Sequence, residues 1–473
     1  MTWRERTEPV RMERVAVVAA QSLLRPVLVR LADCGTVELD APTDGRAGTP
    51  EAVRRLEALS GRQTDLAPVE PRLAEDLPDL DALVAAGRAD LLAGEASLQR
   101  HSASVVTRDD VCAVPGWAVA AELPALRERL APVGGAVVRL PRPRGVDPPT
   151  LLPVRGEIRS SLTPLVDTYG TVPYADVDPT VLAGLAYVLM FGMMFGDLGH
   201  GLLLLATGLL LRSGRPRRWP AVRRAWPFVA GAGVTASLFG VLYGEFFGPT
   251  GAISALWLEP MQEPVTLLVA GIGVGAALLA GAYALGTVNR WREGGWPLAV
   301  YAPSGVAGSA LFLGLGAVAL GVDSDRSRLL VAGAVVWSVG LVLVLTGLLA
   351  GSGGGVTGVL QAVVELFDSL LRVGSNLLSF ARLAAFGLTH AALSDLVWQA
   401  TRSLTDNGGL AWVAALAVFA LGNAAAFSLE ALVAAIQALR LEYYELFSRV
   451  FLAEGRPFRP WHIPTASRTE LLT

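Results

Sequence analysis

Two apolar stretches in the last third of the chain carry polar side chains at helical spacing. In the first stretch these are Asp368, Arg372, Ser375, Ser379 and Arg382, which are four, three, four and three residues apart. This spacing places all five on one face of a helix. Ionisable groups are costly in hydrocarbon and usually mark a functional path. We therefore expect this face to take part in moving an ion.

The polar stripe continues beyond these residues and has a counterpart in the second stretch. Glu365 lies one turn before Asp368, and His390 lies two turns after Arg382. The counterpart consists of Asn423, Glu430, Gln437 and Arg440, at spacings of seven, seven and three. Two helices with facing polar stripes could line an aqueous path through the protein.

Simpler roles remain open for several of these side chains. Arg372 and Arg440 could extend to the cytoplasmic interface, His390 could be an interior packing residue, and the two serines could bond to their own helix. Glu430 could pair with an arginine for structure alone. Arg382 differs because it lies in the middle of an apolar span and stays charged at any working pH.

The first apolar block, 180–212, is too long for one membrane span of roughly 20 residues. Gly196, Asp197, Gly199 and His200 interrupt it and suit a hairpin turn, in which we expect Asp197 and His200 to be turn and interface residues. The split gives two short spans and a total of eight. The other blocks are 225–247, 264–287, 300–321, 327–350, 357–403 and 409–440.

The distribution of arginine supports this number of spans. The loops at 212–224 and 289–296 are basic, and basic loops favour the cytoplasmic side. Eight spans place both loops and both termini in the cytoplasm, whereas seven would place the N-terminal part outside. In the eight-span arrangement, Glu245 ends the third span at the outer surface, with no role that we can assign.

We predict an α-helical polytopic membrane protein of about eight transmembrane helices, the last two long and tilted, with an N-terminal α/β cytoplasmic domain. Within that domain we expect β-α-β over 14–40, a helical hairpin over 51–100 and a second α/β unit over 112–140. The predicted boundaries are a cytoplasmic arm over 1–155, a linker over 156–178, a translocation domain over 179–450 and a cytoplasmic tail over 451–473.

Composition excludes several kinds of function. The chain has no lysine, since all 39 basic residues are arginine. A phosphate-binding P-loop requires its lysine, so we expect no nucleotide site and no ATP hydrolysis by this chain. No basic stripe suits nucleic acid. The two cysteines do not have the spacing of a metal site, and we expect no metal and no cofactor.

Three segments of the chain are similar to a known family. "FGMMFGDLGHGLLLL", "SNLLSFARLAAFGLTHAALS" and "LEALVAAIQALRLEYYELFSRVFLAEGRPFRP" resemble the first-hairpin, seventh-helix and eighth-helix motifs of the V-type ATPase membrane stator. The stator of that family is called subunit a in eukaryotes and subunit I in bacteria and archaea. The resemblance covers nearly the whole chain, although the helical hairpin of the arm is short for the family.

The resemblance implies a role for most of the polar residues. Arg382 would be the essential arginine that faces the rotor ring, and Arg440 the second arginine on the neighbouring helix. His390 and Glu430 match positions tied to proton access. Gln437 stands where eukaryotic members carry a histidine, which leaves its role open. The family's cytoplasmic-side acid corresponds to one of the two acids at positions 365 and 368.

The implied partners are a rotor ring of proteolipid c/K-type subunits, peripheral-stalk and ATPase-head subunits, and the lipid bilayer, with no nucleic acid. The implied location is a bacterial plasma membrane. Two rival classes stay open, a secondary transporter and a non-translocating scaffold. Transporter folds often show paired repeats with broken helices, and the sequence shows no matching halves. Proton or sodium, and pumping or synthesis, are not decided by the sequence.

Overall fold

The computed structural model describes residues 8–40, 51–60, 69–143, 145–153, 156–213, 220–405, 411–451 and 454–466. The chain forms two compact units. The first, here called the helical unit, comprises Met1–Glu8 and Pro153–Glu454. The second, here called the sheet unit, comprises Pro9–Leu152 and Gly455–Thr473. We expected a separate tail over 451–473, whereas its described residues from position 455 onward belong to the sheet unit.

The sheet unit contains an antiparallel sheet in the order β2-β4-β1-β5, with β3 paired to β4. Its strands are β1 (Met12–Ala20), β2 (Val37–Leu39), β3 (Val106–Arg108), β4 (Val111–Val119) and β5 (Ala136–Arg139). The strand-helix-strand order expected over 14–40 is present. However, β1 and β2 are not neighbours, because β4 lies between them.

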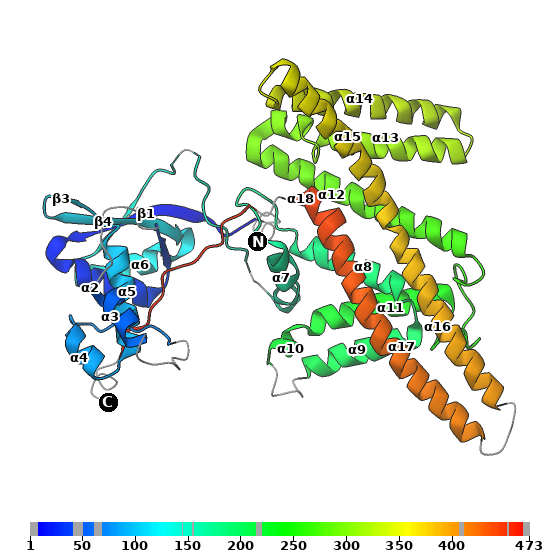
Figure 1. Cartoon of the computed structure of the whole chain (residues 1–473), viewed down its shortest axis with the longest axis horizontal. Coiled ribbons are helices and arrows are strands. Elements are labelled where there is room, and N and C mark those ends of the chain that lie inside the picture. The colour runs from blue at the N-terminus through cyan, green and yellow to red at the C-terminus, as the bar shows by residue number, and fades with distance from the viewer. Residues whose placement is uncertain are drawn as a thin grey trace. The chain divides into compact units, whose positions relative to one another are not determined.

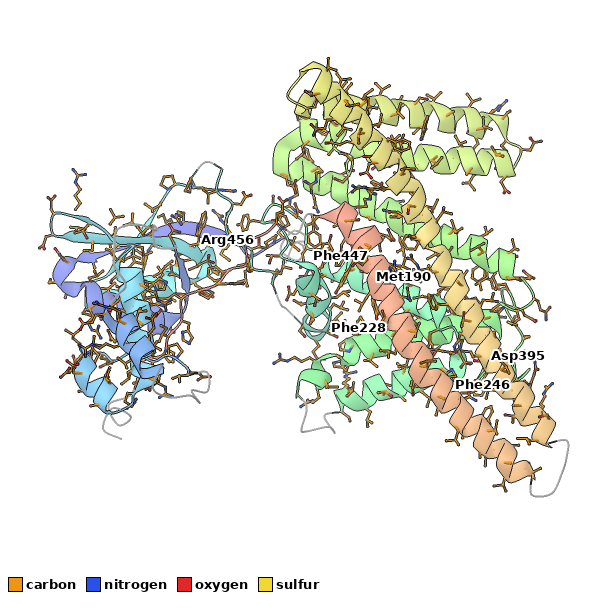
Figure 2. The ribbon with its side chains drawn as sticks, in the orientation of Figure 1. Met190, Phe228, Phe246, Asp395, Phe447 and Arg456 are labelled. Carbon is orange, nitrogen blue, oxygen red and sulfur yellow. The ribbon has the colours of Figure 1, made fainter. Side chains whose placement is uncertain are left out.

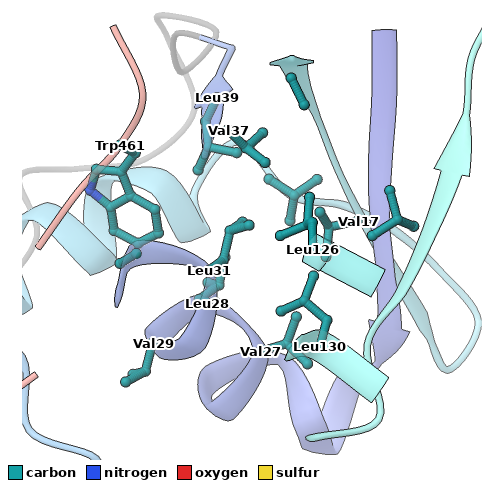
Figure 3. Packing of buried hydrophobic residues seen from close by; sticks show 14 of the residues in the cluster. Val17, Val27, Leu28, Val29, Leu31, Val37, Leu39, Leu126, Leu130 and Trp461 are labelled. Carbon is teal, nitrogen blue, oxygen red and sulfur yellow. The ribbon is translucent and has the colours of Figure 1, made fainter. Parts of the chain in front are cut away.

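The described α-helices that accompany the sheet are α2 (Leu24–Cys34), α3 (Glu51–Ser60), α4 (Leu80–Ala85), α5 (Ala89–Ser102) and α6 (Leu123–Leu130). Short 3₁₀ turns occupy Gln21–Leu23, Ala120–Glu122 and Ala131–Val133. Figure 3 shows the core, where Leu28 and Leu31 of α2 face Leu126 of α6 and Val17 of β1. Trp461, from the C-terminal segment, completes this core.

The helical unit holds the apolar blocks. Its helices are α7 (Glu157–Tyr169), α8 (Thr180–Met194), α9 (Leu198–Arg212), α10 (Pro220–Arg224), α11 (Trp226–Tyr243), α12 (Pro264–Tyr301), α13 (Val306–Asp323), α14 (Ser327–Gly351), α15 (Gly355–Ser379), α16 (Ala381–Thr405), α17 (Ala411–Leu441) and α18 (Ser448–Val450). A π-helical turn, η4 (Glu442–Phe447), joins α17 to α18.

Among the described residues, five helical segments are long and apolar enough to cross a membrane: α11, α12, α13, α14 and Ala411–Val450. The predicted polytopic membrane fold is thereby confirmed. The shorter apolar helices α8 and α9 meet at the turn expected at 195–201. The total of eight spans stays a prediction, since α15 and α16 are not among these five segments.

The last helices run together as the long pair expected from the sequence. Figure 1 shows α16 and α17 side by side along the helical unit, with α15 nearly in line with α16. Helices α8, α9 and α11 form a second group, and α12 packs against α16. The polar stripes of the last two helices therefore lie close to the turn between α8 and α9.

The junction between α15 and α16 is a tight turn centred on Phe380. Phe380 N donates to Leu377 O at 3.2 Å, and Leu383 N donates to Phe380 O at 2.9 Å, so both bonds span three residues. The Phe380 ring is fully buried against Gly275 of α12, where an added Cβ would lie 2.1 Å from Phe380 Cγ. The stripe expected on a single helix is thus divided between two helices, with Arg382 in the first turn of α16.

Polar contacts hold the end of the helical unit that we expect at the cytoplasmic surface. The Asn289 amide accepts from Val177 N at 3.0 Å and donates to Val450 O at 2.9 Å, so it ties α12 to α18 and to the segment before α8. Burial and the neighbouring Glu293 carboxyl raise the pKa of Asp176 to about 8. The raised pKa of Asp176 favours its protonated, neutral form in this buried corner.

Replacing Gly275 by alanine tests whether this close approach positions the junction. Gly275→Ala places a methyl group within the volume of the Phe380 ring, and such overpacking typically costs about 1–3 kcal/mol. Gly273→Ala is the matched control, because nothing lies within 4 Å of its added Cβ. We expect a lower Tm of the purified chain in detergent for Gly275→Ala and an unchanged or higher Tm for Gly273→Ala. Equal Tm values for the two variants would contradict the packing argument.

Candidate functional site

Five ionisable side chains from four parts of the helical unit meet in one buried group, here called the outer cluster. They are Asp197, His200, Glu245, His390 and Glu430. The first two come from the turn into α9, Glu245 follows α11, His390 lies on α16 and Glu430 on α17. None is more than 8% exposed. The structure therefore gathers in one place residues that are more than 200 positions apart.

His390 is the centre of the outer cluster. Its Nδ1 is hydrogen-bonded to Glu430 Oε2, which links α16 to α17. Its Nε2 lies 3.8 Å from Glu245 Oε2 on the opposite side of the ring. The pairing of His390 with Glu430 on neighbouring polar faces agrees with the predicted facing stripes. The imidazole thus stands between two carboxylates, hydrogen-bonded to that of Glu430 and close to that of Glu245.

Asp197 and His200 are buried in this cluster and are not interface residues, contrary to our expectation. Asp197 caps α9, since its Oδ1 accepts from His200 N at 2.8 Å. Its Oδ2 accepts from Gly248 N, also at 2.8 Å. The centroid of the His200 ring lies 5.7 Å from that of His390. The predicted hairpin turn is present, and its burial follows from close packing of the segment after α11 against it.

The glycines of the hairpin allow that packing. An added Cβ at Gly196 would lie 2.6 Å from the Tyr243 ring, and one at Gly199 would lie 2.5 Å from the Phe247 ring. Phe247 itself has φ +49°, in the left-handed region that side chains rarely adopt. Gly248 follows with φ +92°. This turn brings the Gly248 N–H back to Asp197.

Glu245 was expected at the outer surface, but it is only 4% exposed. Figure 2 shows its neighbour Phe246 and Asp395 of α16 at the same end of the helical unit. An added Cβ at Gly248 would lie 3.0 Å from Ser394 O, so the loop contacts α16 directly. One signal in the sequence could have indicated this grouping. The eight-span arrangement places "FGDLGHG", "LYGEFFG", His390 and Glu430 all toward the outer side.

The charges of the outer cluster are balanced only within it. Among the described residues, no arginine lies within ion-pair distance of the carboxylates of Asp197, Glu245 or Glu430. Three carboxylates and two imidazoles cannot all be ionised away from water without a large cost. The charges of the cluster must therefore be balanced among these five groups or by a bound species.

Arg382 has a different environment. Its Nη1 is buried and has no hydrogen-bond partner among the described residues. Within that same part of the chain, no carboxylate lies within 4.0 Å of its guanidinium. By contrast, Arg372 on α15 pairs with Asp368, and both side chains are more than half exposed. Arg382 is therefore a charge in an apolar helix that no described residue of the chain neutralises.

Among the remaining predicted residues, Asn423 has its side chain beside His200, and the others do not join the outer cluster. Ser379 Oγ donates to Ser375 O at 3.0 Å, as expected for a serine that bonds to its own helix. Glu365 accepts from Gln361 Nε2 at 2.9 Å and is exposed on α15. Asp368 is likewise exposed, so the candidate acids at 365 and 368 both face outward.

On α17, Asn423 is buried and donates to Phe419 O at 2.9 Å. Gln437 has a buried Oε1 without a hydrogen-bond partner in the described part of the chain. Arg440, one turn later, is exposed. The polar face predicted for α17 is present, and only Glu430 bonds directly to α16.

An apolar groove of about 700 Å³ lies on the surface of α16 and α17, lined by Leu393, Leu396, Val397, Gly422, Ala425, Ala426, Ser428, Leu429 and Leu432. The α17 side consists largely of small residues, which allow another helix to approach closely. Leu396, Leu429 and Leu432 are each at least 60% exposed. This surface suits lipid or a helix of a neighbouring protein.

Comparison with known proteins identifies the relatives of this chain. The model of the V-type ATPase 116kDa subunit family matches residues 107–217. The A-type ATP synthase subunit I of Aeropyrum pernix is 26% identical over 93% of this chain and 70% of its own length. That of Pyrococcus horikoshii is 26% identical over 64% of this chain. The V-type ATP synthase subunit I 2 of Treponema pallidum is 39% identical over 25% of this chain.

These matches cover different shares of the relatives. The chain spans 46% of the Pyrococcus protein and 25% of the Treponema protein. The match to the Aeropyrum protein nevertheless covers both the sheet unit and the helical unit. The family model spans the end of the sheet unit and the hairpin of α8 and α9, which carries Asp197 and His200. With the polytopic fold and the motifs on α16 and α17, these matches make the chain similar to the subunit I proteins of A-type and V-type ATPases.

Proposed function

We propose that this chain is the ion-translocating stator subunit of a rotary ATPase, with Arg382 facing the rotor ring. The observation that carries the proposal is the buried guanidinium atom of Arg382, which has no anionic partner among the described residues. A permanent cation in an apolar helix is stable only with a counter-charge or water. A carboxylate on a neighbouring ring subunit supplies that charge from outside the chain.

Charge selection gives the proposed mechanism. A ring carboxylate can face lipid only when it is neutral, because a bare charge in hydrocarbon is costly. Beside Arg382 the same carboxylate is favoured as an anion, since an opposite charge stabilises the ionised form. The ion therefore leaves the ring before Arg382, and another binds after it. Arg382 also blocks direct leakage of ions between the two access paths.

The outer cluster serves as the outer access path in this proposal. His390 lies eight residues after Arg382, about 12 Å along a helix at 1.5 Å per residue. Its contacts with Glu430 and Glu245 form a chain of proton-exchanging groups across α17, α16 and the segment after α11. These groups are buried in the protein interior, away from lipid. Protons would pass along them between the outside and the ring.

The other side of the membrane requires a second access path, which α15 and the end of α17 provide in this proposal. Glu365 and Asp368 are exposed on α15, and Arg440 is exposed near the end of α17. The exposed groove of α16 and α17 would contact the ring. The proposed partners are that ring and the peripheral-stalk and ATPase-head subunits, which alone would bind ATP.

The proposed orientation places both termini and the basic loop after α9 in the cytoplasm. Ser213 ends α9, and Ser324 lies in the turn between α13 and α14; both are exposed. In a background of Cys34→Ala and Cys112→Ala, we expect Ser213→Cys to react with an impermeant thiol reagent from the cytoplasmic side only. Ser324→Cys should react from the outside only. Labelling of both positions from the same side would contradict the eight-span arrangement.

Arg382→Ala should reduce ATP-coupled transport in vesicles to the background level while the complex still assembles. Arg382→Lys should also lose most transport, because lysine can release its proton when desolvated and lacks the planar guanidinium. Arg402→Ala, on the same helix, is the control and should keep transport, since Arg402 stacks on Trp398. Transport is normalised to assembled complex. Near-normal coupled transport by Arg382→Ala would refute the proposed role.

Glu430→Gln should slow ion flux by about 100-fold or more, the usual contribution of a positioned proton-transfer group. The amide can still accept the hydrogen bond from His390, so assembly should persist, but it cannot carry a proton. The dependence of flux on the outside pH should change as well. Glu263→Gln, an exposed acid before α12, serves as the control. Unchanged flux in assembled Glu430→Gln complexes would leave Glu430 with a structural role only.

A further inference from the structure

The outer cluster contains more unbonded donor atoms than proton exchange with Glu430 requires. Buried atoms without a hydrogen-bond partner among the described residues include both ring nitrogens of His200, Nε2 of His390 and Oε2 of Glu245. Leaving such atoms unpaired away from water is unfavourable. Several such atoms are expected to lie together where a bound ion or molecule interacts with them.

The geometry around these atoms is close to that of a metal site. One ligand atom from each of Asp197, His200 and His390 lies within 4.8 Å of the others. His200 Nδ1 is 3.7 Å from Asp197 Oδ1, and His390 Nε2 is 3.8 Å from Glu245 Oε2. In a tetrahedral zinc site with bonds of about 2.0–2.1 Å, neighbouring ligand atoms lie roughly 3.3 Å apart. Small side-chain rotations would close the cluster around an ion.

Two further contacts prepare the ligands for a metal. In this arrangement His390 Nδ1 donates a hydrogen bond to Glu430. The lone pair of His390 Nε2 then remains available on the side of Glu245. A carboxylate behind a ligating histidine is the usual support in zinc proteins. Asp197 is held by the backbone N–H groups of His200 and Gly248. These bonds fix the direction of its carboxylate beside the His200 ring.

We propose that the outer cluster is a binding site for Zn²⁺, with His200, His390, Asp197 and Glu245 as ligands and Glu430 as the support of His390. Two imidazole nitrogens and two carboxylate oxygens suit zinc, whereas magnesium and calcium prefer oxygen ligands alone. The sequence predicted no metal site because the four ligands come from three separate segments and none is a cysteine. Bound Zn²⁺ occupies the atoms that otherwise exchange protons.

Zinc binding to the purified full-length chain tests the site itself. The chain in detergent is stripped with a chelator, dialysed against Zn²⁺ with excess Mg²⁺, and its metal content is measured. We expect one Zn²⁺ per chain, with a zinc-edge X-ray absorption spectrum of nitrogen and oxygen ligands only. His200→Gln should lose this zinc while its size-exclusion profile and Tm stay near those of the unaltered chain.

The control variant removes the two histidines of the sheet unit, His101→Gln together with His462→Gln, and should keep the zinc. Absence of zinc from the unaltered chain, sulfur ligands in the spectrum, or equal zinc in the His200→Gln chain would each overturn the proposal. If His200→Gln does not fold, Glu245→Gln replaces it, because this change keeps the shape of the side chain and removes a ligand charge. Retention of full zinc affinity by a folded Glu245→Gln chain would also overturn the proposed ligand set.

The effect of zinc on transport rests on the proposed function and is measured separately. Zn²⁺ added to the outer side of vesicles should slow ion flux in the unaltered complex, and a chelator should restore it. Zinc binding at these residues together with a slowed flux would support both the zinc site and the placement of the outer cluster on the ion path. A chain that binds zinc at these residues with undiminished flux would confirm the metal site and contradict the placement of the cluster on the ion path.

Discussion

The cost of placing charge outside water governs the helical unit. Arg382 has no anion within its own described residues, while the carboxylates of the outer cluster have only imidazoles as cationic neighbours. The first arrangement needs a charge from another molecule, and the second needs protons or a metal ion. The other features follow from these needs. The long helices α16 and α17 carry the groups, and the hairpin of α8 and α9 covers them from lipid.

Much of this fold was predictable because its signals are local. The lengths of the apolar blocks predicted the helices. The spacing of the polar residues that include His390 in one block and Glu430 in the next predicted two polar helix faces. The turn at Gly196 and Gly199 was also visible in the sequence. The sequence did not predict the burial of Glu245 and His200, because it depends on a returning loop with Phe247 in a rare backbone conformation. The interruption at Phe380 was missed because it depends on contact with Gly275, more than 100 residues away.

Close packing and charge placement are connected at that interruption. Gly275 admits the Phe380 ring, and the tight turn there sets where α16 begins and where Arg382 lies on it. A methyl group added at Gly275 on α12 would therefore change the position of the Arg382 charge without contacting it. The same relation holds at the hairpin, where the glycines bring Tyr243 and Phe247 close enough for Gly248 to bond Asp197. Both candidate sites therefore depend on close packing at glycines.

The return of the C-terminal segment to the sheet unit has a consequence for biosynthesis. Trp461 and Ile463 belong to the same core as β1 and α2. About 300 residues of the helical unit are translated between Leu152 and Gly455. At about 5–20 residues per second this takes roughly 15–60 s, during which a ribosome holds a sheet unit with an incomplete core. The core of the sheet unit can thus be completed only after the helical unit has been translated. A truncated chain would expose apolar surface that cellular proteases could recognise.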